Sequence, residues 1–446
     1  VYVQGYGVKD LGTGARVTPD TLFQIASTSK AFTSTALAML VSEGKVSWDD
    51  PVRQYLPYFE FTDMCANSQV TVRDIVSHRT GLGRHDELWD NTPLTREEVI
   101  RGVNASGLAR PFRTAYQYQN IMFIAAGEVA AKAAGMPWDD FVRARIFAPL
   151  NMTRTITSDE QWLASDHATG YRYDWKTDRI APQKPIETYT LGSAGAIKSS
   201  ARDMANWLRF HLGNGTFELH QLLDPAALEE TKMPQTVRRW ENTTRDENPE
   251  TNVISYAMGW NVQDYRGELL VSHSGALNGF RTQVDLLPKR NSGFVVMVNV
   301  GRGLAVVALR NALADILLGK AGRDWNEYYL ALDRREDEKE AQQKAERLSK
   351  RDAVSKPALP LASYAGEYES RSHGKATVTL EGDALVLRWS RIVAPLRHFE
   401  FDTFDAVSDE ADLDEAVTFG FNAKREIESL TLFGQTFRKQ PARSHQ

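Results

Sequence analysis

The sequence pattern changes near residue 323, and this change limits the folds that are open to the chain. Residues 323–352 are charged and helix-prone with little apolar face, which favours a solvated linker helix over a helix that binds a partner. The segment "SKPALPL" at 355–361 then marks a boundary. From Tyr364 onward apolar and polar residues alternate, and "EGD" at 381–383 indicates a hairpin turn. The last part of the chain is therefore predicted to be a small, separate β-barrel or sandwich.

The part that precedes the linker mixes strands and helices. Residues 1–27 have the pattern of two strands around a Gly-rich turn, and further strands are predicted within 267–301. Residues 70–230 contain short helical segments separated by loops. Strands at both ends with helices between them predict an α+β domain whose terminal strands share one antiparallel sheet. We therefore expect an α+β domain at 1–322, a charged helical linker at 323–360 and a β domain at 361–441.

Composition excludes several classes of function. The chain has 446 residues, 42% of them hydrophobic, and a net charge of −5 without a basic tract, so we expect no nucleic-acid partner. No stretch approaches 18 apolar residues, so no membrane span is expected. The single cysteine, Cys65, excludes an internal disulfide and a thiolate metal cluster. The composition is that of a soluble globular protein that can bury a large core.

The chain starts at Val1 with a strand-like segment instead of a methionine. We therefore expect the sequence to begin inside a mature or trimmed protein, so that a signal peptide would already be lost. Secreted, periplasmic and cytoplasmic locations all stay open, and so does a homo-oligomer.

Two Ser-x-x-Lys motifs lie close together in the chain. Ser27 and Lys30 stand at the start of an apolar helix, where side chains three residues apart share a face. Ser42 and Lys45 straddle the end of the same helix beside Gly44, which favours a surface position. A serine hydroxyl needs a base to become a nucleophile, and a buried lysine held neutral can be that base. Only the first motif therefore qualifies as a catalytic pair.

Two further motifs supply groups that such a site needs. Tyr118 and Asn120 precede an apolar helix, where the hydroxyl could relay a proton and the amide could hold a substrate carbonyl. Taken alone, this motif fits a turn tyrosine and a helix-capping asparagine better. His273, Ser274 and Gly275 end a predicted strand, whose edge could donate a backbone N–H to an oxyanion.

The ordered set of motifs resembles the penicillin-recognising serine hydrolases, in particular the class C β-lactamase-like branch. The resemblance covers residues 5 to about 320, and the tail from Tyr364 is similar to the lipocalin-like domain of some members. It implies an antiparallel sheet flanked by helices, a helical subdomain and a C-terminal lipocalin-like barrel. The segments that carry it are "GYGVKDLGTGARVTPDTLFQIASTSKAFTS", "DIVSHRTGL", "YQYQNIMFIAAGEV" and "GSAGAIKSSARDMANWL".

The resemblance also implies a role for each matching residue. Ser27 would be the acylated nucleophile, with Lys30 and Tyr118 as paired general bases. His273 would occupy the place of the lysine in the family's Lys-Thr-Gly motif. The substrate-binding positions would be Asn120 as an amide donor, Ser274 and Gly275 on the strand, and Ala276, whose N–H would form the oxyanion hole together with that of Ser27.

The change from lysine to His273 shifts the expected substrate. A lysine there would be charged, whereas a histidine with a pKa near its usual ~6.5 is mostly neutral at pH 7. In this family a histidine resembles the pattern of family VIII esterases, D-aminopeptidases and peptidases of the S12 type. We therefore expect hydrolysis of small esters, or of amides and peptides with D-residues, without a cofactor.

Other functions remain as alternatives. Acyl transfer, including peptide cyclisation, would use the same residues with an amine or alcohol in place of water, and β-lactamase action ranks below it. A non-catalytic binding protein on the same fold is disfavoured, because a residue capable of the expected chemistry is present at every catalytic position that the resemblance implies. His78 and His85 near Asp86 suggest a metal site in isolation, but the resemblance makes this segment a structural loop, and we expect no metal there.

Overall fold

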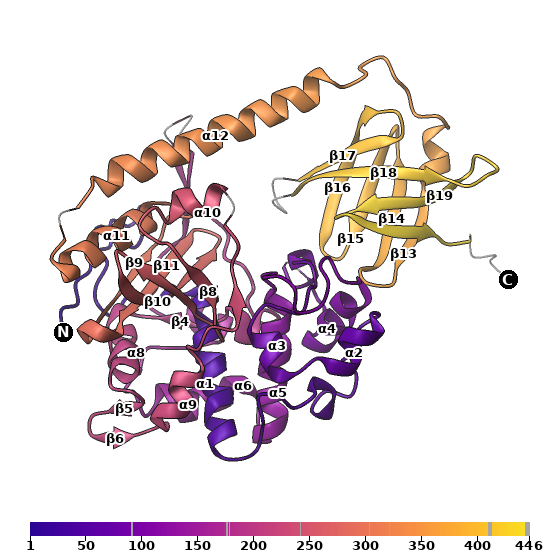
Figure 1. Cartoon of the computed structure of the whole chain (residues 1–446). Coiled ribbons are helices and arrows are strands. Elements are labelled where there is room, and N and C mark those ends of the chain that lie inside the picture. Colours follow the sequence, from indigo (N-terminus) through magenta and orange to yellow (C-terminus); the bar gives the residue numbers. More distant parts are fainter. Residues whose placement is uncertain are drawn as a thin grey trace. The chain divides into compact units, whose positions relative to one another are not determined.

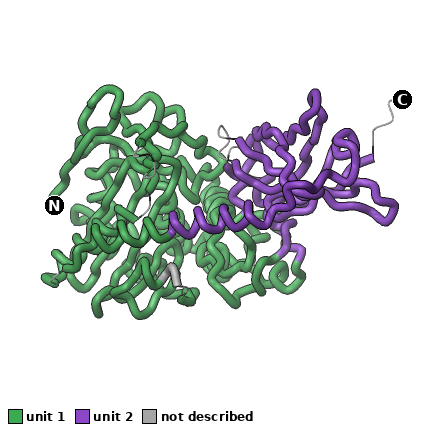
Figure 2. Tube along the Cα trace, turned by 90° about the horizontal axis from the view of Figure 1, so that it is seen from above, with its two compact units in different colours: residues 1–59, 63–84, 108–335 green, residues 60–62, 85–107, 336–446 purple. Residues whose placement is uncertain are grey.

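The computed structural model divides the chain into two compact units, which Figure 2 colours separately. Unit 1 contains 1–59, 63–84 and 108–335, and unit 2 contains 60–62, 85–107 and 336–446. The predicted fold class, an α+β domain followed by an all-β barrel, is confirmed. The structure describes residues 1–90, 92–174, 177, 179–240, 242–302, 304–320, 322–408 and 413–441.

The centre of unit 1 is a six-stranded antiparallel sheet in the order β12-β11-β10-β9-β8-β7. Strands that follow one another in the chain are therefore neighbours in the sheet, with short connections from β8 to β12 and a longer one, which contains a helix, between β7 and β8 (Figure 1). The strands are β7 (Thr236–Val237), β8 (Ile254–Tyr256), β9 (Asn261–Tyr265), β10 (Glu268–Leu277), β11 (Phe280–Leu287) and β12 (Ser292–Val298).

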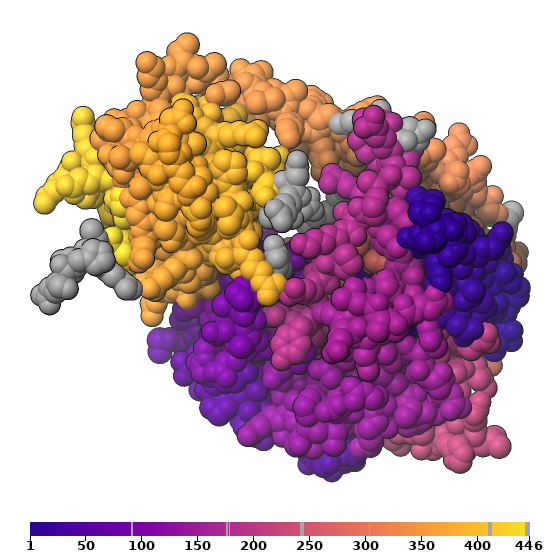
Figure 3. All heavy atoms as spheres, turned by 180° about the vertical axis from the view of Figure 1, so that it is seen from behind, coloured from indigo at the N-terminus to yellow at the C-terminus, as the bar shows by residue number. Residues whose placement is uncertain are grey.

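The expectation that N-terminal strands join this sheet is wrong. Within the described residues, the segment before β1 forms isolated bridges from Val8 to Arg16 and from Leu22 to His167, and Figure 3 shows the indigo N-terminal residues at the surface. Gly7 and Gly14 have φ angles of 67° and 68°, which a β-strand cannot contain. Further on, β1 (Phe23–Gln24) pairs with β4 (Lys198–Ser199) in a separate two-stranded sheet.

Helices α8 (Ala201–Leu212) and α11 (Leu304–Leu318) cover opposite faces of the large sheet. Consecutive residues of a strand point to opposite faces, so Leu286 and Leu287 mark the two sides. Leu287 packs in one cluster with Ala314 and Leu318 of α11. Gly293, the cross-strand partner of Leu286, lies against Leu208 of α8.

Helix α1 (Ser29–Ser42) lies inside unit 1 and is buried along most of its length. The ring of Phe32 on α1 stacks on Trp207 of α8 with centroids 3.7 Å apart, so α1 is fixed against the layer that covers the sheet. The other helices of this unit are α3 (Val72–Val76), α5 (Asn120–Ala134), α6 (Trp138–Val142), α7 (Asp159–Leu163), α9 (Pro225–Glu230), α10 (Asn242–Glu247) and the short 3-10 helices η1 (Ala26–Thr28) and η5 (Gly192–Ala194); α2 spans Met64–Gln69.

Unit 2 contains a closed eight-stranded barrel, which confirms the predicted lipocalin-like domain. The strands alternate buried and exposed residues, and Tyr364, Phe404 and Phe419 make edge-to-face contacts inside. The strands are β13 (Gly366–Ser370), β14 (Gly374–Glu381), β15 (Ala384–Trp389), β16 (Ile392–Glu400), β17 (Thr403–Ser408), β18 (Leu413–Phe421), β19 (Ile427–Leu432) and β20 (Gln435–Lys439).

Two helical segments lie outside the sheet and the barrel. Unit 2 contains η3 (Asp86–Leu88) and α4 (Arg96–Ala105), which belong to the segment 85–107. The charged segment predicted as a linker helix forms α12 (Trp325–Ser349), of which only Trp325, Tyr329 and Leu332 are buried. Among the helices within the described residues, none is both long and apolar enough to cross a membrane.

Candidate active site

Ser27 and Lys30 lie together at the point where β1 leads into α1. Ser27 is in η1, and its Oγ is 3.0 Å from Nζ of Lys30 on the first turn of α1. The backbone of Ala26 has a φ of 50°, which is unusual for a residue other than glycine and sharpens the turn before the serine. Ser27 is half-buried, whereas Lys30 is completely buried.

The ammonium group of Lys30 is surrounded by oxygen atoms and aromatic rings. Nζ lies 2.7 Å from Oδ1 of Asn120 and 2.8 Å from the carbonyl oxygen of Ala194 in η5. A neutral amine has two hydrogens and one lone pair. With its hydrogens donated to Asn120 and Ala194, the lone pair would face the hydroxyl of Ser27. The site can therefore accommodate Lys30 as a base as well as an ammonium ion.

Tyr118 lies immediately before α5 and is held there by its neighbours in the chain. The side chain of Gln119 caps α5 by accepting a hydrogen bond from N–H of Ile121 at 2.8 Å. The N–H of Gln119 donates to Nδ1 of His78 at 3.1 Å. The ring of Tyr118 lies over Lys30, with Nζ 4.9 Å from the ring centroid, so the tyrosine borders the pair formed by Ser27 and Lys30.

His273 lies on β10 and is buried beside Tyr118, with the two ring centroids 6.5 Å apart. Its Nδ1 is 2.7 Å from the carbonyl oxygen of Ser274, and its Nε2 is 3.0 Å from the hydroxyl of Tyr256 on β8. Burial and the charge of Lys30 lower the pKa of His273 to about 3. His273 is therefore neutral at pH 7.

Gly275 brings β10 against the segment that carries the serine. A Cβ at this position would overlap the carbonyl oxygen of Ile25, so only glycine allows the approach. Ser274 and Ala276 flank it with exposed positions. The strand edge thus passes beside η1, as an oxyanion site would require. The roles inferred for Ser274, Gly275 and Ala276 stay predictions.

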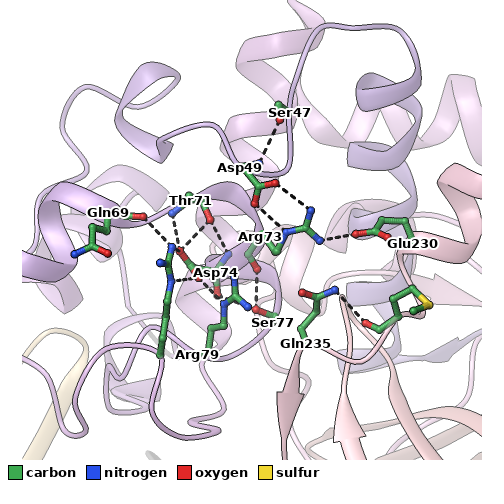
Figure 4. Close-up of polar contacts among 12 residues, drawn as sticks. Ser47, Asp49, Gln69, Thr71, Arg73, Asp74, Ser77, Arg79, Glu230 and Gln235 are labelled. Atoms are coloured by element: carbon green, nitrogen blue, oxygen red, sulfur yellow. Dashed lines mark hydrogen bonds and ion pairs between the residues drawn. The ribbon is translucent and has the colours of Figure 1, made fainter.

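A buried carboxylate fixes the loop that carries His78 (Figure 4). Asp74 on α3 accepts hydrogen bonds from Arg79 at 2.5 Å and from Arg113 at 2.6 Å and 2.9 Å. Burial opposes the ionisation of Asp74, but the hydrogen bond from Arg113 and the charge of Arg79 outweigh it and lower the pKa. The carbonyl oxygen of His78 also accepts from N–H of Gln117 at 2.8 Å, which ties this loop to the residues before α5.

The second Ser-x-x-Lys motif has no comparable surroundings. Lys45 is about half-exposed, and its Nζ is 2.8 Å from a carboxylate oxygen of Glu43. Ser42 ends α1 and is exposed. The spacing of the motif alone is therefore not what distinguishes Ser27.

The two histidines considered for a metal lie in different units. His78 belongs to unit 1 and is buried against Tyr118, with ring centroids 4.2 Å apart, whereas His85 belongs to unit 2. Burial and the charge of Lys30 hold the pKa of His78 well below its usual value. His78 is therefore part of the aromatic wall of the site in its neutral form.

Sequence reasoning missed two contributors to the site. Tyr256 reaches His273 only because β8, β9 and β10 are neighbours in the sheet, with Tyr256 opposite Asn261 and Asn261 opposite Ser272. Ala194 contributes through its backbone carbonyl. Every residue type has this group, so the sequence gives no sign of its role. A tyrosine two strands before the His-Ser-Gly motif was the one available signal.

The architecture and the pair formed by Ser27 and Lys30 define a class of protein, the β-lactamase-like serine hydrolases. The family model described as Beta-lactamase matches residues 1–318, and the chain therefore belongs to this family. Residues 350–444 match a model described as a domain of unknown function, DUF3471.

Relatives and solved structures agree with this assignment. The chain is 32% identical over 396 residues to an unguisins hydrolase of Aspergillus campestris, covering 84% of this chain and 72% of the relative. An octameric penicillin-binding protein homologue from Pyrococcus abyssi has the same fold, with a TM-score of 0.64, 22% identity and coverage of 98% and 93%. A D-amino acid amidase from Ochrobactrum anthropi has a TM-score of 0.53 and 25% identity, covering 66% of this chain and 81% of the amidase.

Proposed function

We propose that this protein hydrolyses small esters, or amides and peptides with D-residues, through an acyl-enzyme on Ser27. The observation that carries the proposal is the distance of 3.0 Å between Oγ of Ser27 and Nζ of Lys30, in a site where Lys30 is fully buried. Burial disfavours the charged form of a lysine, which is the condition for its action as a base.

Acylation would begin with attack of Oγ on the substrate carbonyl carbon. The proton of Ser27 passes to Lys30 or Tyr118, and the N–H groups of Ser27 and Ala276 hold the oxyanion. When the tetrahedral intermediate breaks down, the bond to the leaving amine or alcohol is cleaved, and that group takes the proton back. The Nδ2 group of Asn120 is the donor that would hold the acyl portion, because its Oδ1 accepts from Lys30.

Deacylation would reverse these proton transfers with water as the nucleophile. Lys30 or Tyr118 accepts one proton from water as the water oxygen attacks the acyl carbon, the bond from that carbon to Oγ of Ser27 breaks, and the proton returns to Oγ as the acid product leaves. His273 is neutral and forms a wall of the site through its contact with Tyr256. It therefore lacks the fixed charge of the family's lysine, which disfavours β-lactamase action.

The name of one structural relative favours amide bonds among the candidate substrates. It is a D-amino acid amidase with 25% identity to this chain. We therefore place D-aminoacyl amides and peptides first and small esters second.

A parallel activity panel tests the proposal. It compares the wild type, Ser27→Ala and the control Ser42→Ala on p-nitrophenyl butyrate, D- and L-aminoacyl p-nitroanilides and a chromogenic cephalosporin. We expect D-amide or ester turnover that falls at least about 1,000-fold in Ser27→Ala and is unchanged in Ser42→Ala. Undiminished turnover in folded Ser27→Ala would overturn the assignment of the nucleophile.

If the wild type hydrolyses none of these substrates, labelling with a fluorophosphonate distinguishes acyl transfer from a non-catalytic binding function. Labelling of Ser27 without hydrolysis would replace our proposal with acyl transfer to an amine or alcohol, including peptide cyclisation. Absence of labelling in the folded protein would replace it with a non-catalytic binding function.

A further inference from the structure

Two histidines and one glutamate that belong to none of the catalytic motifs meet in unit 2. Nδ1 of His85 is 3.1 Å from Oε1 of Glu87, and Nε2 of His373 is 2.7 Å from the same oxygen. All three ligand atoms lie within 4.8 Å of one another. The residues come from η3 and the residue before it, and from the turn between β13 and β14 of the barrel.

We propose that His85, Glu87 and His373 form a Zn²⁺ site that fastens the segment 85–107 to the barrel. In tetrahedral zinc sites with bonds of about 2.0–2.2 Å, neighbouring ligand atoms lie about 3.3–3.5 Å apart. The distances of 3.1 Å and 2.7 Å are somewhat shorter than this separation, as hydrogen bonds are. A cation would thus replace the protons that now join the glutamate to the two imidazoles, with only small side-chain movements.

The surroundings of His373 prepare its Nε2 for a metal. Nδ1 of His373 is 2.7 Å from Oγ of Ser372, which can donate to Nδ1 while Nε2 carries its proton and can accept from Nδ1–H once a metal takes the Nε2 lone pair. The carbonyl oxygen of His373 accepts from Nε1 of Trp389 at 2.8 Å, which fixes the backbone. These contacts hold the orientation of the ring with and without a metal.

The exposure of the three side chains fits a site that keeps one open position. The side chain of His373 is fully buried, whereas those of His85 and Glu87 are 13% and 19% exposed. Water can therefore complete the coordination from the side of His85 and Glu87. Two imidazoles and one carboxylate suit zinc and related transition metals, whereas Mg²⁺ and Ca²⁺ prefer oxygen ligands alone.

Zinc binding is tested on the full, untagged chain after dialysis against a chelator. Isothermal titration with ZnCl₂ should give one zinc per chain, and zinc should raise the melting temperature. His85→Ala and Glu87→Gln change partly exposed side chains and should each weaken binding at least about 10-fold. His398→Ala is the matched control, because Nε2 of this barrel histidine lies 2.9 Å from the carbonyl oxygen of Phe401 and its ring contacts Phe404, away from the three proposed ligands.

The outcomes separate the zinc site from a simple ion-pair cluster. Binding that survives in His398→Ala but weakens in both test variants supports the site, and X-ray absorption at the zinc edge should then show two imidazole ligands. Absence of binding in the wild type would mean that Glu87 only pairs with the two histidines, and the proposal falls. It also falls if the folded variants bind zinc as tightly as the wild type, or if the absorption spectrum shows no imidazole.

Discussion

The hydroxyl of Tyr256 lies 3.0 Å from Nε2 of His273, and this contact joins β8 to β10 beside the candidate catalytic pair. Nδ1 of His273 faces the carbonyl oxygen of Ser274, which only accepts hydrogen bonds, so Nδ1 carries the proton. Nε2 is then an acceptor, and Tyr256 donates to it. The tyrosine therefore fixes both the tautomer and the orientation of His273.

Substitution Tyr256→Phe should weaken catalysis without abolishing it. The change leaves Nε2 of His273 buried without its donor, which costs about 1–3 kcal/mol of unfolding free energy. We expect kcat/KM to fall about 10-fold, mainly through kcat, as the ring of His273 loses its fixed orientation. Steady-state kinetics and denaturant unfolding measure both effects. Tyr116→Phe is the control, since it removes a hydroxyl from the same aromatic group without touching His273, and an equal loss in both variants would contradict the positioning role.

The amine of Lys30 should be indispensable, unlike that of Lys45. Lys30→Met keeps the length of the side chain but removes the group 3.0 Å from Oγ of Ser27. We expect at least about a 1,000-fold loss of activity and slow labelling by a fluorophosphonate, because the nucleophile has lost its base. Lys45→Met alters the second Ser-x-x-Lys motif and should leave activity within about 2-fold. Similar losses in the two variants would show that charge, and not the buried amine, is what matters.

Gly275 should tolerate no side chain. A Cβ there overlaps the carbonyl oxygen of Ile25, so Gly275→Ala must push β10 away from the segment that carries Ser27. We expect a lower melting temperature and at least a 10-fold lower kcat, since oxyanion donors depend on sub-ångström placement. Gly12→Ala is the matched control, because its added carbon meets only a side-chain oxygen of Asp10 at 3.4 Å. Normal activity in Gly275→Ala would remove β10 from the proposed oxyanion site.

These examples show which parts of the molecule the sequence could predict. Ser27 and Lys30 are three residues apart on one helix, so local geometry alone brings them together, and the alternation after Tyr364 gives the barrel directly. The contact between Tyr256 and His273 depends on the register of three strands, which no local pattern encodes. The zinc cluster likewise joins His85 to His373, and only tertiary packing brings two such distant residues together.

The prediction that the N-terminal strands join the large sheet was wrong for a different reason. Its alternation of Val, Tyr and polar residues favours a strand, but Gly7 and Gly14 adopt positive φ angles that interrupt a ladder. Periodicity records which side chains would fit a sheet, whereas the glycines decide whether the backbone is extended.

The carboxylate of Asp74 should make unit 1 sensitive to acid. Its folded pKa is lowered, so the stability it contributes is present above its unfolded value of about 4 and is lost as the pH falls below that value. Asp74→Asn leaves Arg79 and Arg113 without their buried partner and should cost about 3 kcal/mol of unfolding free energy at pH 7. Urea unfolding at pH 3, 5 and 7 measures this difference. The difference in unfolding free energy between wild type and Asp74→Asn should be smaller at pH 3 than at pH 7. A difference that does not depend on pH would contradict an ion pair between Asp74 and the two arginines.

His273 should produce a second, separate pH dependence between pH 6.5 and 3. Its pKa is lowered to about 3 in the folded protein, against about 6.5 in the unfolded chain. Between these values the unfolded chain binds one more proton at this residue, so stability falls as the pH falls, by up to about 1.4 kcal/mol per pH unit. His273→Gln has no group to protonate and should reduce the slope of unfolding free energy against pH by about that amount. His220→Gln changes an exposed histidine and should leave the slope unaltered. If the slope of unfolding free energy against pH is the same in His273→Gln and in the wild type, His273 is protonated in the folded protein. The active site would then contain a cationic imidazole at this position instead of the neutral one inferred here.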